Sequence, residues 1–324
     1  MRCMATAQHA GVPEIVTLKS LQVQDLDPVL EEEALAWRSL LRWDFTASAE
    51  LVRRFLRIHA LAGYALISRD RVAGYCYYVC EERKGLIGDL FLAREHAGTQ
   101  NEDHLLGAVL NELICTPYLQ RIEAQLMMLH GPFERPMPLA AFSEVFPRIF
   151  MMADLAEVAQ LPAASAAHST RIVPWSEHRQ EEAAMLIASA YQGHVDSRIN
   201  DQYRSYAGAK RFLLNIVQYP GCGKFYPAGS FMAEDSKGRL CGIVLSSHIA
   251  DDVGHVTQIC VAPEWKGRGI GYELMRAALL AMQRAGCDRV SLTVTASNPG
   301  AIQLYQRMGF RATRRFAAYV WDGF

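Results

Sequence analysis

Apolar and polar residues alternate with strand-like and helix-like periodicity, and these segments occur in the same order in both halves of the chain. Short apolar runs separated by charged or glycine turns predict three strands in the first half, at 64–68, 72–81 and 86–93. A second set is predicted in the other half, at 230–234, 240–249 and 255–261. Each set is preceded by two segments with helical period and followed by another helix and another strand. The pattern therefore predicts two domains that mix helices and strands.

The remaining elements complete the two sets. Helices are predicted at 28–43, 49–60, 102–114, 177–191, 201–217, 270–285 and 299–308. A first strand and its exit are predicted at 15–26, and further strands at 122–129, 149–158, 171–173, 289–294 and 314–321. Asp27 before Pro28 is expected to cap the first helix.

An internal repeat supports the division into two domains. Residues 72–75 match 240–243, and residues 85–95 match 254–264. We expect one domain over 14–159 and a second over 170–324. The Ala-, Ser- and Pro-rich stretch 160–169 is expected to be a linker, and residues 1–13 a short mobile leader.

A glycine-rich stretch in the second half joins a strand to a helix. The apolar run 259–261 is followed by glycines at three alternate positions, 267, 269 and 271, and the helix begins at once. Glycines let backbone N–H groups approach a ligand closely, and a helix N-terminus adds free donors and positive charge. The stretch therefore predicts a seat for a phosphate or pyrophosphate. A P-loop and a dinucleotide fingerprint are excluded because neither Gly-Lys-Ser/Thr nor G-x-G-x-x-G is present.

Two ordered signatures in this half resemble those of the GCN5-related N-acetyltransferase (GNAT) superfamily. Residues 266–271, Lys-Gly-Arg-Gly-Ile-Gly, resemble the Q/R-x-x-G-x-G/A signature, with Lys266 in place of the usual Gln or Arg. Residues 298–310 match N-x-x-A-x-x-L-Y-x-x-x-G-F at every named position. The resemblance covers roughly 170–324. It implies an α+β fold in which helices flank a mixed, mostly antiparallel sheet, with a splayed pair of parallel strands that receives acetyl-CoA.

The resemblance also implies which residues hold acetyl-CoA. The backbone contacts are expected from the strand before the loop, and the phosphate contacts from the loop itself. The expected cofactor-binding residues are Ile259, Cys260, Val261, Lys266, Gly267, Arg268, Gly269, Ile270, Gly271, Asn298 and Tyr305. Asn298 also precedes Pro299 as a helix N-cap would, and the two roles are compatible.

Tyr305 and His255 are the expected catalytic residues. Tyr305 matches the family tyrosine that protonates the leaving CoA thiolate, although a packing role alone would also suit a helical aromatic. His255 lies at the strand position where related enzymes carry a catalytic glutamate. An imidazole can accept a proton near neutral pH, so His255 is the expected general base. An ordinary strand histidine is the alternative, with Asp251, Asp252 or water as the base.

The amine that accepts the acetyl group is expected to contact the segment between residues 191 and 226. Its acidic and tyrosine side chains suit a cationic amine with an apolar body, although solvated helix faces and core tyrosines fit the same residues. The candidate substrate residues are Asp196, Tyr203, Tyr206 and Tyr226.

The first half carries a degenerate version of the glycine stretch. Residues 96–103, His-Ala-Gly-Thr-Gln-Asn-Glu-Asp, hold one glycine and two carboxylates where a pyrophosphate would lie. A carboxylate repels an anion at that place. We therefore expect this half to be a scaffold that does not bind CoA tightly.

Composition narrows the function classes. Net charge is −1 and the sequence pI is about 6.8, which gives no basic surface for nucleic acid or an anionic membrane. No apolar run reaches the length of a membrane span, and the eight cysteines have no zinc-ligand spacing, so we expect no metal and a reducing cytoplasm. The sequence predicts an acetyl-CoA-dependent N-acetyltransferase that acts on the amine of a small molecule or peptide. The alternative is a non-catalytic acyl-CoA-binding or regulatory protein, and the oligomeric state stays open.

Overall fold

The computed structural model describes residues 13–133, 135–163, 170–219 and 221–324. Most of the predicted leader and most of the predicted linker lie outside these ranges. The chain divides into two compact units whose segments alternate along the sequence. Unit 1 comprises the chain up to residue 35 with 49–144 and 319–324, and unit 2 comprises 36–48 and 145–318. The predicted domain limits, 14–159 and 170–324, remain a prediction from sequence.

Unit 1 holds a mixed sheet with one parallel pair. Its strands are β1 (Glu14–Thr17), β2 (Ala62–Ser68), β3 (Arg71–Glu81), β4 (Lys84–Leu92) and β5 (Arg121–Leu126). Its helical segments belong to α1 (Val23–Leu41), α2 (Thr46–Arg57) and α3 (Thr99–Cys115). Neighbouring strands from β1 to β4 are antiparallel, whereas β4 and β5 are parallel from Lys84 beside Arg121 to Ile87 beside Ala124.

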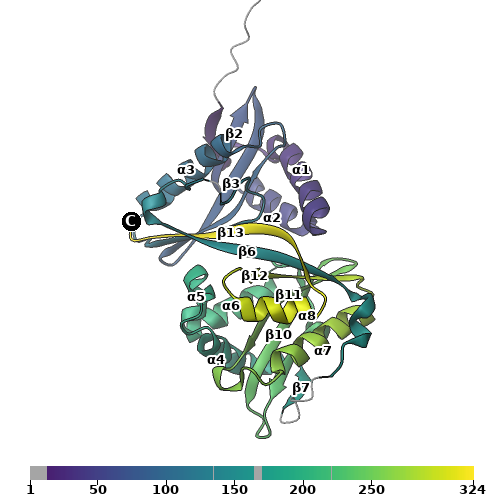
Figure 1. Ribbon diagram of the computed structural model, residues 1–324. Helices are drawn as coiled ribbons and strands as arrows, with labels where there is room; N and C mark the ends of the chain where they lie inside the picture. The colour runs from purple at the N-terminus through teal and green to yellow at the C-terminus, as the bar shows by residue number, and fades with distance from the viewer. Residues whose placement is uncertain (1–12, 134, 164–169, 220) are drawn as a thin grey trace, which may run out of the picture. The chain divides into compact units, whose positions relative to one another are not determined.

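Unit 2 repeats this arrangement. Its strands are β6 (Ser143–Asp154), β7 (Arg171–Pro174), β8 (Lys224–Phe225), β9 (Phe231–Glu234), β10 (Leu240–Ala250), β11 (Val253–Val261), β12 (Arg289–Thr295) and β13 (Arg311–Asp322), of which β6 and β13 also have residues in unit 1. Its helices are α4 (Gln180–Ala190), α5 (Asp196–Ile199), α6 (Tyr206–Gln218), α7 (Ile270–Arg284) and α8 (Pro299–Arg307). The order β7-β9-β10-β11 is antiparallel, and β11 and β12 are parallel. The predicted fold, two domains whose strands form a mixed, mostly antiparallel arrangement flanked by helices, is confirmed (Figure 1).

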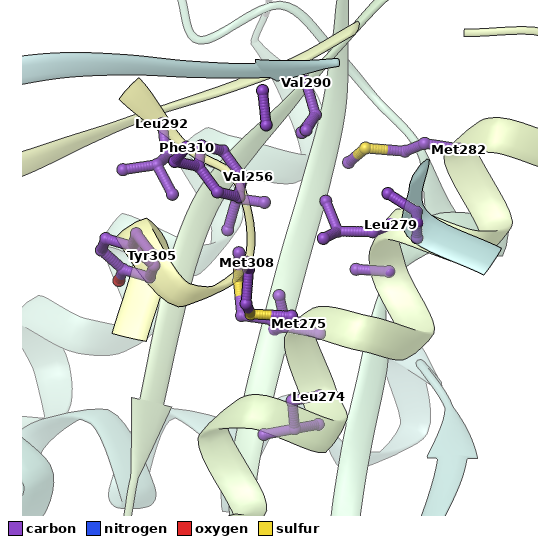
Figure 2. Packing of buried hydrophobic residues seen from close by; sticks show 14 of the residues in the cluster. Val256, Leu274, Met275, Leu279, Met282, Val290, Leu292, Tyr305, Met308 and Phe310 are labelled. Carbon is purple, nitrogen blue, oxygen red and sulfur yellow. The ribbon is translucent and has the colours of Figure 1, made fainter. Parts of the chain in front are cut away.

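Two apolar clusters fix the helices to the sheet of unit 2. One joins α4 and α6 to β9, β10 and β11 on one face. The other joins α7 and α8 to the opposite side chains of the same strands, and Figure 2 shows Met275, Met282 and Leu279 of α7 in it together with Tyr305 and Met308. Burial of such side chains contributes roughly 1.5–3 kcal/mol each. The sheet is therefore held between two helical layers.

The first helix begins earlier than the sequence suggested. The structure starts α1 at Val23, so the expected cap at Asp27 is wrong and Pro28 lies inside the helix. The Asp25 carboxylate accepts the N–H of Gln22 at 2.8 Å, which satisfies a donor that the helix start leaves free. Asp27 instead accepts from Arg53 Nε at 2.7 Å. A hydrogen bond from the Gln22 N–H to the Asp25 carboxylate therefore stands at the start of the helix in place of the familiar Asp-Pro start.

Strand β6 takes a place that the repeat did not predict. It was expected at 149–158 as the last strand of the first half. It begins at Ser143, and within unit 2 it pairs with β12 in antiparallel register from Arg148 beside Thr295 to Asp154 beside Arg289. Strand β12 is consequently bordered on one side by β6 and on the other by the first part of β11.

Candidate active site

The parallel strands β11 and β12 separate after four paired residues. They are in register from Val253 beside Arg289 to Val256 beside Leu292. Beyond that point β11 continues to Val261 against β10, while β12 stays with β6. No strand of the described chain pairs with the β12-facing edge of β11 after Val256. Because unpaired strand edges present free N–H and C=O groups, this edge can accept an extended ligand.

The predicted backbone contacts lie along this edge. Ile259 and Val261 pack toward α7, and Cys260 faces the α4 and α6 cluster. Burial raises the pKa of the Cys260 thiol to about 12, so this cysteine stays protonated and is no nucleophile at neutral pH. The strand therefore offers its backbone rather than its side chains.

The glycine loop leads from this edge into α7. Gly267 and Gly269 have φ values of 76° and 79°, the left-handed region that favours glycine. Gly269 is the N-cap of α7 and has no side chain to cover the first N–H groups of the helix. Space around Gly267 is open, since an added Cβ would meet no atom within 4 Å. Lys266 and Arg268 are exposed, and the Arg268 guanidinium lies 4.8 Å from the Trp265 ring centroid.

Asn298 and Tyr305 follow β12, the other strand of the parallel pair. Asn298 is the N-cap of α8, and Tyr305 lies within that helix. Asn298 caps the helix by accepting the Ala301 N–H at 3.2 Å, as expected. Tyr305 is 7% exposed and packs against Phe310. Figure 2 shows its hydroxyl oxygen pointing away from Met308 and the other labelled core side chains. Burial, followed by the charge of Asp196, raises the pKa of the Tyr305 hydroxyl, so it remains a hydrogen-bond donor at neutral pH.

A hydrogen-bonded row of side chains connects the acceptor segment to β11. The Tyr203 hydroxyl donates to Gln258 Oε1 at 3.2 Å, and Gln258 Nε2 donates to the Tyr191 hydroxyl at 2.9 Å. The Tyr191 hydroxyl in turn donates to the Ile259 carbonyl at 3.3 Å. The rings of Tyr191 and Tyr203 are stacked with centroids 4.3 Å apart. Tyr203 therefore lies beside β11, whereas its partners Tyr191 and Gln258 were absent from the predicted set.

The carboxylate of Asp196, in α5, contacts side chains of β12 and β6. Its Oδ1 accepts from the Thr295 hydroxyl and lies 3.4 Å from Arg148 Nη1. Arg148 Nη1 also donates to Thr295 Oγ1 at 3.1 Å, while Arg148 Nε is buried without a partner in the described chain. Arg148 comes from β6, so no sequence pattern in the second half could reveal it. The carboxylate is thus fixed at the open end of β12.

The other two candidate substrate residues lie apart from this group. Tyr206 is the first residue of α6 and is 40% exposed. Tyr226 contacts the ring of His248, with centroids 4.4 Å apart. Tyr203 and Asp196 are therefore the two candidates that the structure brings toward β11 and β12.

His255 lies in the paired part of β11, before the strands separate. Its Nδ1 is 2.9 Å from Ser291 Oγ, and its ring lies between Trp43 and Phe150, with centroids 5.2 and 6.2 Å away. Desolvation lowers the pKa of the imidazole to about 4. Asp251 and Asp252 are exposed on the turn before β11, at the closed end of the pair. These surroundings favour a neutral, enclosed His255 that holds the strand pair, and its role as base remains a prediction.

Burial of His255 predicts an acid-sensitive unit 2. Because the folded pKa of about 4 is below the ordinary value of 6.5, the unfolded chain binds more protons between those pH values. Stability should therefore fall as pH drops through this window, by roughly 2–3 kcal/mol between pH 7 and 4.5, since one pKa unit is about 1.36 kcal/mol. Urea unfolding of wild type and His255→Gln at both pH values measures the difference. Equal pH dependence of the two proteins would show that the imidazole is not desolvated.

The corresponding place in unit 1 is filled by protein side chains. Glu102, in the first turn of α3, is buried and accepts from the His130 backbone N–H at 2.9 Å. It also lies 2.8 Å from His130 Nδ1 and accepts from Arg135 Nη2 at 2.8 Å. The segment after β5, which stands in sequence order where α8 stands in unit 2, is thereby tied to α3.

No metal-binding group of three or more His, Cys, Asp or Glu was found in the described residues, and none of their helices is long and apolar enough to cross a bilayer.

Comparison with known proteins places this geometry in a family. The model of the Acetyltransferase (GNAT) family matches residues 199–310. N-alpha-acetyltransferase MAK3 from Arabidopsis thaliana is 30% identical over 138 residues, which cover 38% of this chain and 72% of that protein. A mycothiol acetyltransferase from Pseudarthrobacter chlorophenolicus is 29% identical over 56% of this chain and 55% of its own length. The chain therefore spans only about half of that second relative.

Solved structures resemble the fold over nearly the whole length of the chain. A GCN5-related N-acetyltransferase from Sphaerobacter thermophilus has a TM-score of 0.64 at 17% identity and covers 95% of each chain. A tandem GNAT protein from the clavulanic acid biosynthesis pathway has a TM-score of 0.60 at 18% identity, covering 96% of this chain and 98% of that one. At these identities the likeness concerns the fold. The chain belongs to the GNAT family of acetyltransferases and is an enzyme of the N-acetyltransferase class.

Proposed function

We propose that this protein transfers the acetyl group of acetyl-CoA to an amine, and that unit 2 carries the reaction. The observation that carries this proposal is the continuity of the site. The unpaired edge of β11 leads, through the short 3-10 helix Pro263–Trp265, to a glycine loop whose open backbone is followed by the start of α7, where no side chain caps the helix. Few ligands need both an extended polar edge and a pyrophosphate seat, and acetyl-CoA is one of them.

Acetyl-CoA would occupy these two features in sequence. Its pantetheine amides would pair with the backbone around Ile259 and Val261, as an added strand does. Its pyrophosphate would accept N–H groups from Gly267 to Gly271 and the first turn of α7. The exposed charges of Lys266 and Arg268 favour an anion at this loop. Residues 170–324, the predicted catalytic domain, contain all of these groups.

Tyr305 is proposed as the acid that serves the leaving sulfur. The amine nitrogen attacks the thioester carbonyl, the carbon–sulfur bond breaks, and the thiolate takes a proton. Tyr305 sits on α8 beside the open end of the strand pair, with its hydroxyl turned away from the core. Asn298 at the start of the same helix would contact the cofactor through its amide.

The acceptor is proposed to be a cationic amine of a small molecule or a peptide. The Asp196 carboxylate and the stacked pair Tyr191 and Tyr203 offer a charge and aromatic faces beside β11. Tyr206 and Tyr226 remain candidates for more distant parts of the acceptor. The names of two relatives, an N-alpha-acetyltransferase and a mycothiol acetyltransferase, are compatible with either acceptor type.

Unit 1 is proposed to lack CoA binding, because Glu102 and its partners fill the place of a pyrophosphate and no second glycine loop is present.

The free cysteines of the described chain fit the predicted cytoplasmic location.

Release of free thiol from acetyl-CoA tests the proposal. The amines offered should be a peptide with a free N-terminus, spermidine and glucosamine, with a trapped-thiol absorbance as the readout. We expect amine-dependent turnover, with the acetylated product confirmed by mass. Saturable acetyl-CoA binding with no turnover on any amine would favour the non-catalytic acyl-CoA-binding alternative.

A further inference from the structure

The ion pair between Arg148 of β6 and Asp196 of α5 is incomplete. Arg148 Nη1 is 3.4 Å from Asp196 Oδ1 and 3.1 Å from Thr295 Oγ1. The Thr295 hydroxyl donates to the same carboxylate oxygen. An arginine and a carboxylate that satisfy each other often make two parallel bonds of about 2.7–2.9 Å. Here one nitrogen and one oxygen make a single, longer contact, so each side chain keeps hydrogen-bonding capacity.

The remaining polar atoms of this pair have no hydrogen-bond partner among the described residues. Asp196 Oδ2 has only the His194 imidazole nearby, with Nδ1 3.7 Å away, which is beyond hydrogen-bonding distance. Arg148 Nε is enclosed without an acceptor, and Nη2, on the same edge of the guanidinium, has none either. The two side chains are only 13% and 20% exposed. Because enclosed polar groups normally have partners, one carboxylate oxygen and one guanidinium edge are left for a ligand.

A second guanidinium lies on the same face of β6. The Arg198 side chain of α5 has its Cζ 5.4 Å from the Phe146 ring centroid. Phe146 and Arg148 are two residues apart on the strand, so their side chains leave the same face of the sheet. Two arginines and one aspartate therefore gather where α5 meets β6. This balance of charge favours a ligand that carries a negative group as well as an amine.

The ion pair lies near the proposed acid. Burial and then the charge of Asp196 raise the pKa of the Tyr305 hydroxyl, whereas the charge of Arg148 lowers it. Burial and the same two charges act on the pKa of Tyr203, which lies beside β11. Thr295, which bonds both members of the pair, is the last residue of β12. A small acceptor held by both charges would therefore have its amine beside the place proposed for the thioester.

We propose that the acceptor is a free α-amino acid, whose amine is held by Asp196 Oδ2 and whose carboxylate is held by the open edge of the Arg148 guanidinium. The inference rests on the proposed function. In an α-amino acid the two charged groups share one carbon atom, which suits opposite charges on neighbouring side chains. A carboxylate at this edge supplies the acceptor that Nε lacks once the guanidinium turns toward it. A polyamine has no group for Arg148, and in a peptide the first carboxylate has become an amide.

The reaction then yields an N-acetyl amino acid and CoA. The ammonium loses one proton to solvent, and the neutral nitrogen attacks the thioester carbonyl. The carbon–nitrogen bond forms as the carbon–sulfur bond breaks, and the thiolate takes a proton from Tyr305. The second proton of the nitrogen restores Tyr305 through solvent. Arg148 takes no part in these bond changes and determines only which acceptor is bound.

Amino acids paired with their amides test this inference. The standard amino acids are offered to the full chain with acetyl-CoA, and the one acetylated fastest is compared with its carboxamide. The amide keeps the amine and the side chain but lacks the negative charge. Thiol release gives kcat/KM for each. We expect a preference of about 10–100-fold for the free amino acid, the range that a hydrogen bond to a charged group supplies.

Arg148→Gln should reduce this preference to about threefold or less, mainly through KM for the free amino acid. Comparing one ratio in two proteins cancels the intrinsic difference between the two amines. Arg148→Lys keeps a charge beside Asp196 without the planar edge, so it should keep part of the preference even if the glutamine variant does not fold. Acetyl-CoA affinity, measured by calorimetry, reports folding. Arg171→Gln, which removes an arginine from an ion pair with Glu234 on β9, is the control and should keep the wild-type preference.

Three results would contradict the inference in different ways. If wild type acetylates the peptide, spermidine or glucosamine but no free amino acid, the acceptor class is wrong and the proposed function stands. If a folded Arg148→Gln or Arg148→Lys keeps the full preference for the free amino acid, Arg148 does not hold the acceptor carboxylate. Absence of turnover by wild type on every amine would overturn the proposed function, and this inference with it.

Discussion

Tyr305→Phe is expected to lower kcat by about 10²–10⁴-fold, the range that general acid catalysis usually supplies. The phenylalanine ring fills the same space beside Phe310 and Met308, so packing and folding should change little. Only the hydroxyl that would protonate the sulfur is lost. Stopped-flow measurement of thiol release, with calorimetry of acetyl-CoA binding, separates the chemical step from affinity.

A matched variant distinguishes this loss from a general effect of removing a buried hydroxyl. The Tyr319 hydroxyl donates to the Pro132 carbonyl at 3.0 Å within unit 1. Tyr319→Phe should therefore cost about 1 kcal/mol of stability and leave kcat unchanged. Wild-type kcat in Tyr305→Phe, with chemistry shown to be rate-limiting, would remove the acid role and leave protonation of the thiolate to water.

Gly271→Asp is expected to weaken acetyl-CoA binding by about 100-fold or more, because it places a negative charge where the pyrophosphate would lie. Gly269→Asp should do the same, but its φ of 79° adds backbone strain to the effect. Gly271 is the cleaner position. An added Cβ there would lie 3.7 Å from Leu304 and Val261, an ordinary contact distance. A carboxylate near a helix N-terminus also favours the fold of α7.

Two controls accompany this variant. Gly271→Ala adds the Cβ without the charge and should keep most of the affinity. Gly107→Asp puts the same charge into α3, where an added Cβ meets nothing within 4 Å, and should leave binding unchanged. Calorimetry with acetyl-CoA and far-UV circular dichroism report affinity and folding. Unchanged affinity in both Gly269→Asp and Gly271→Asp would remove the loop from the site.

The order of elements and the glycine loop could be predicted from local sequence. Strand alternation and helix period repeat in both halves, and the positive φ values of Gly267 and Gly269 explain why glycine occupies those positions. The start of α1 could not be read in the same way. Asp27-Pro28 has the form of a helix start, yet α1 begins earlier, at Val23, where the Asp25 carboxylate accepts the Gln22 N–H.

Long-range pairing accounts for most of what the sequence left open. Strand β6 precedes residue 160, yet it pairs with β12 of unit 2 and brings Arg148 to Asp196. A fragment that begins near residue 170 would lack this strand. The surroundings of His255 also come partly from distant segments, because Trp43 and Phe150 enclose it. A histidine on a strand gives no sign of such burial.

Hydrogen exchange of the full chain with and without acetyl-CoA tests most directly whether unit 2 holds the cofactor. We expect slower exchange at the amides of 257–261 and 267–272, which would bind the pantetheine and the pyrophosphate. The equivalent segments of unit 1, 88–92 and 98–103, should exchange at the same rate in both samples. Protection in those unit 1 segments, with none along β11 and the start of α7, would contradict the account.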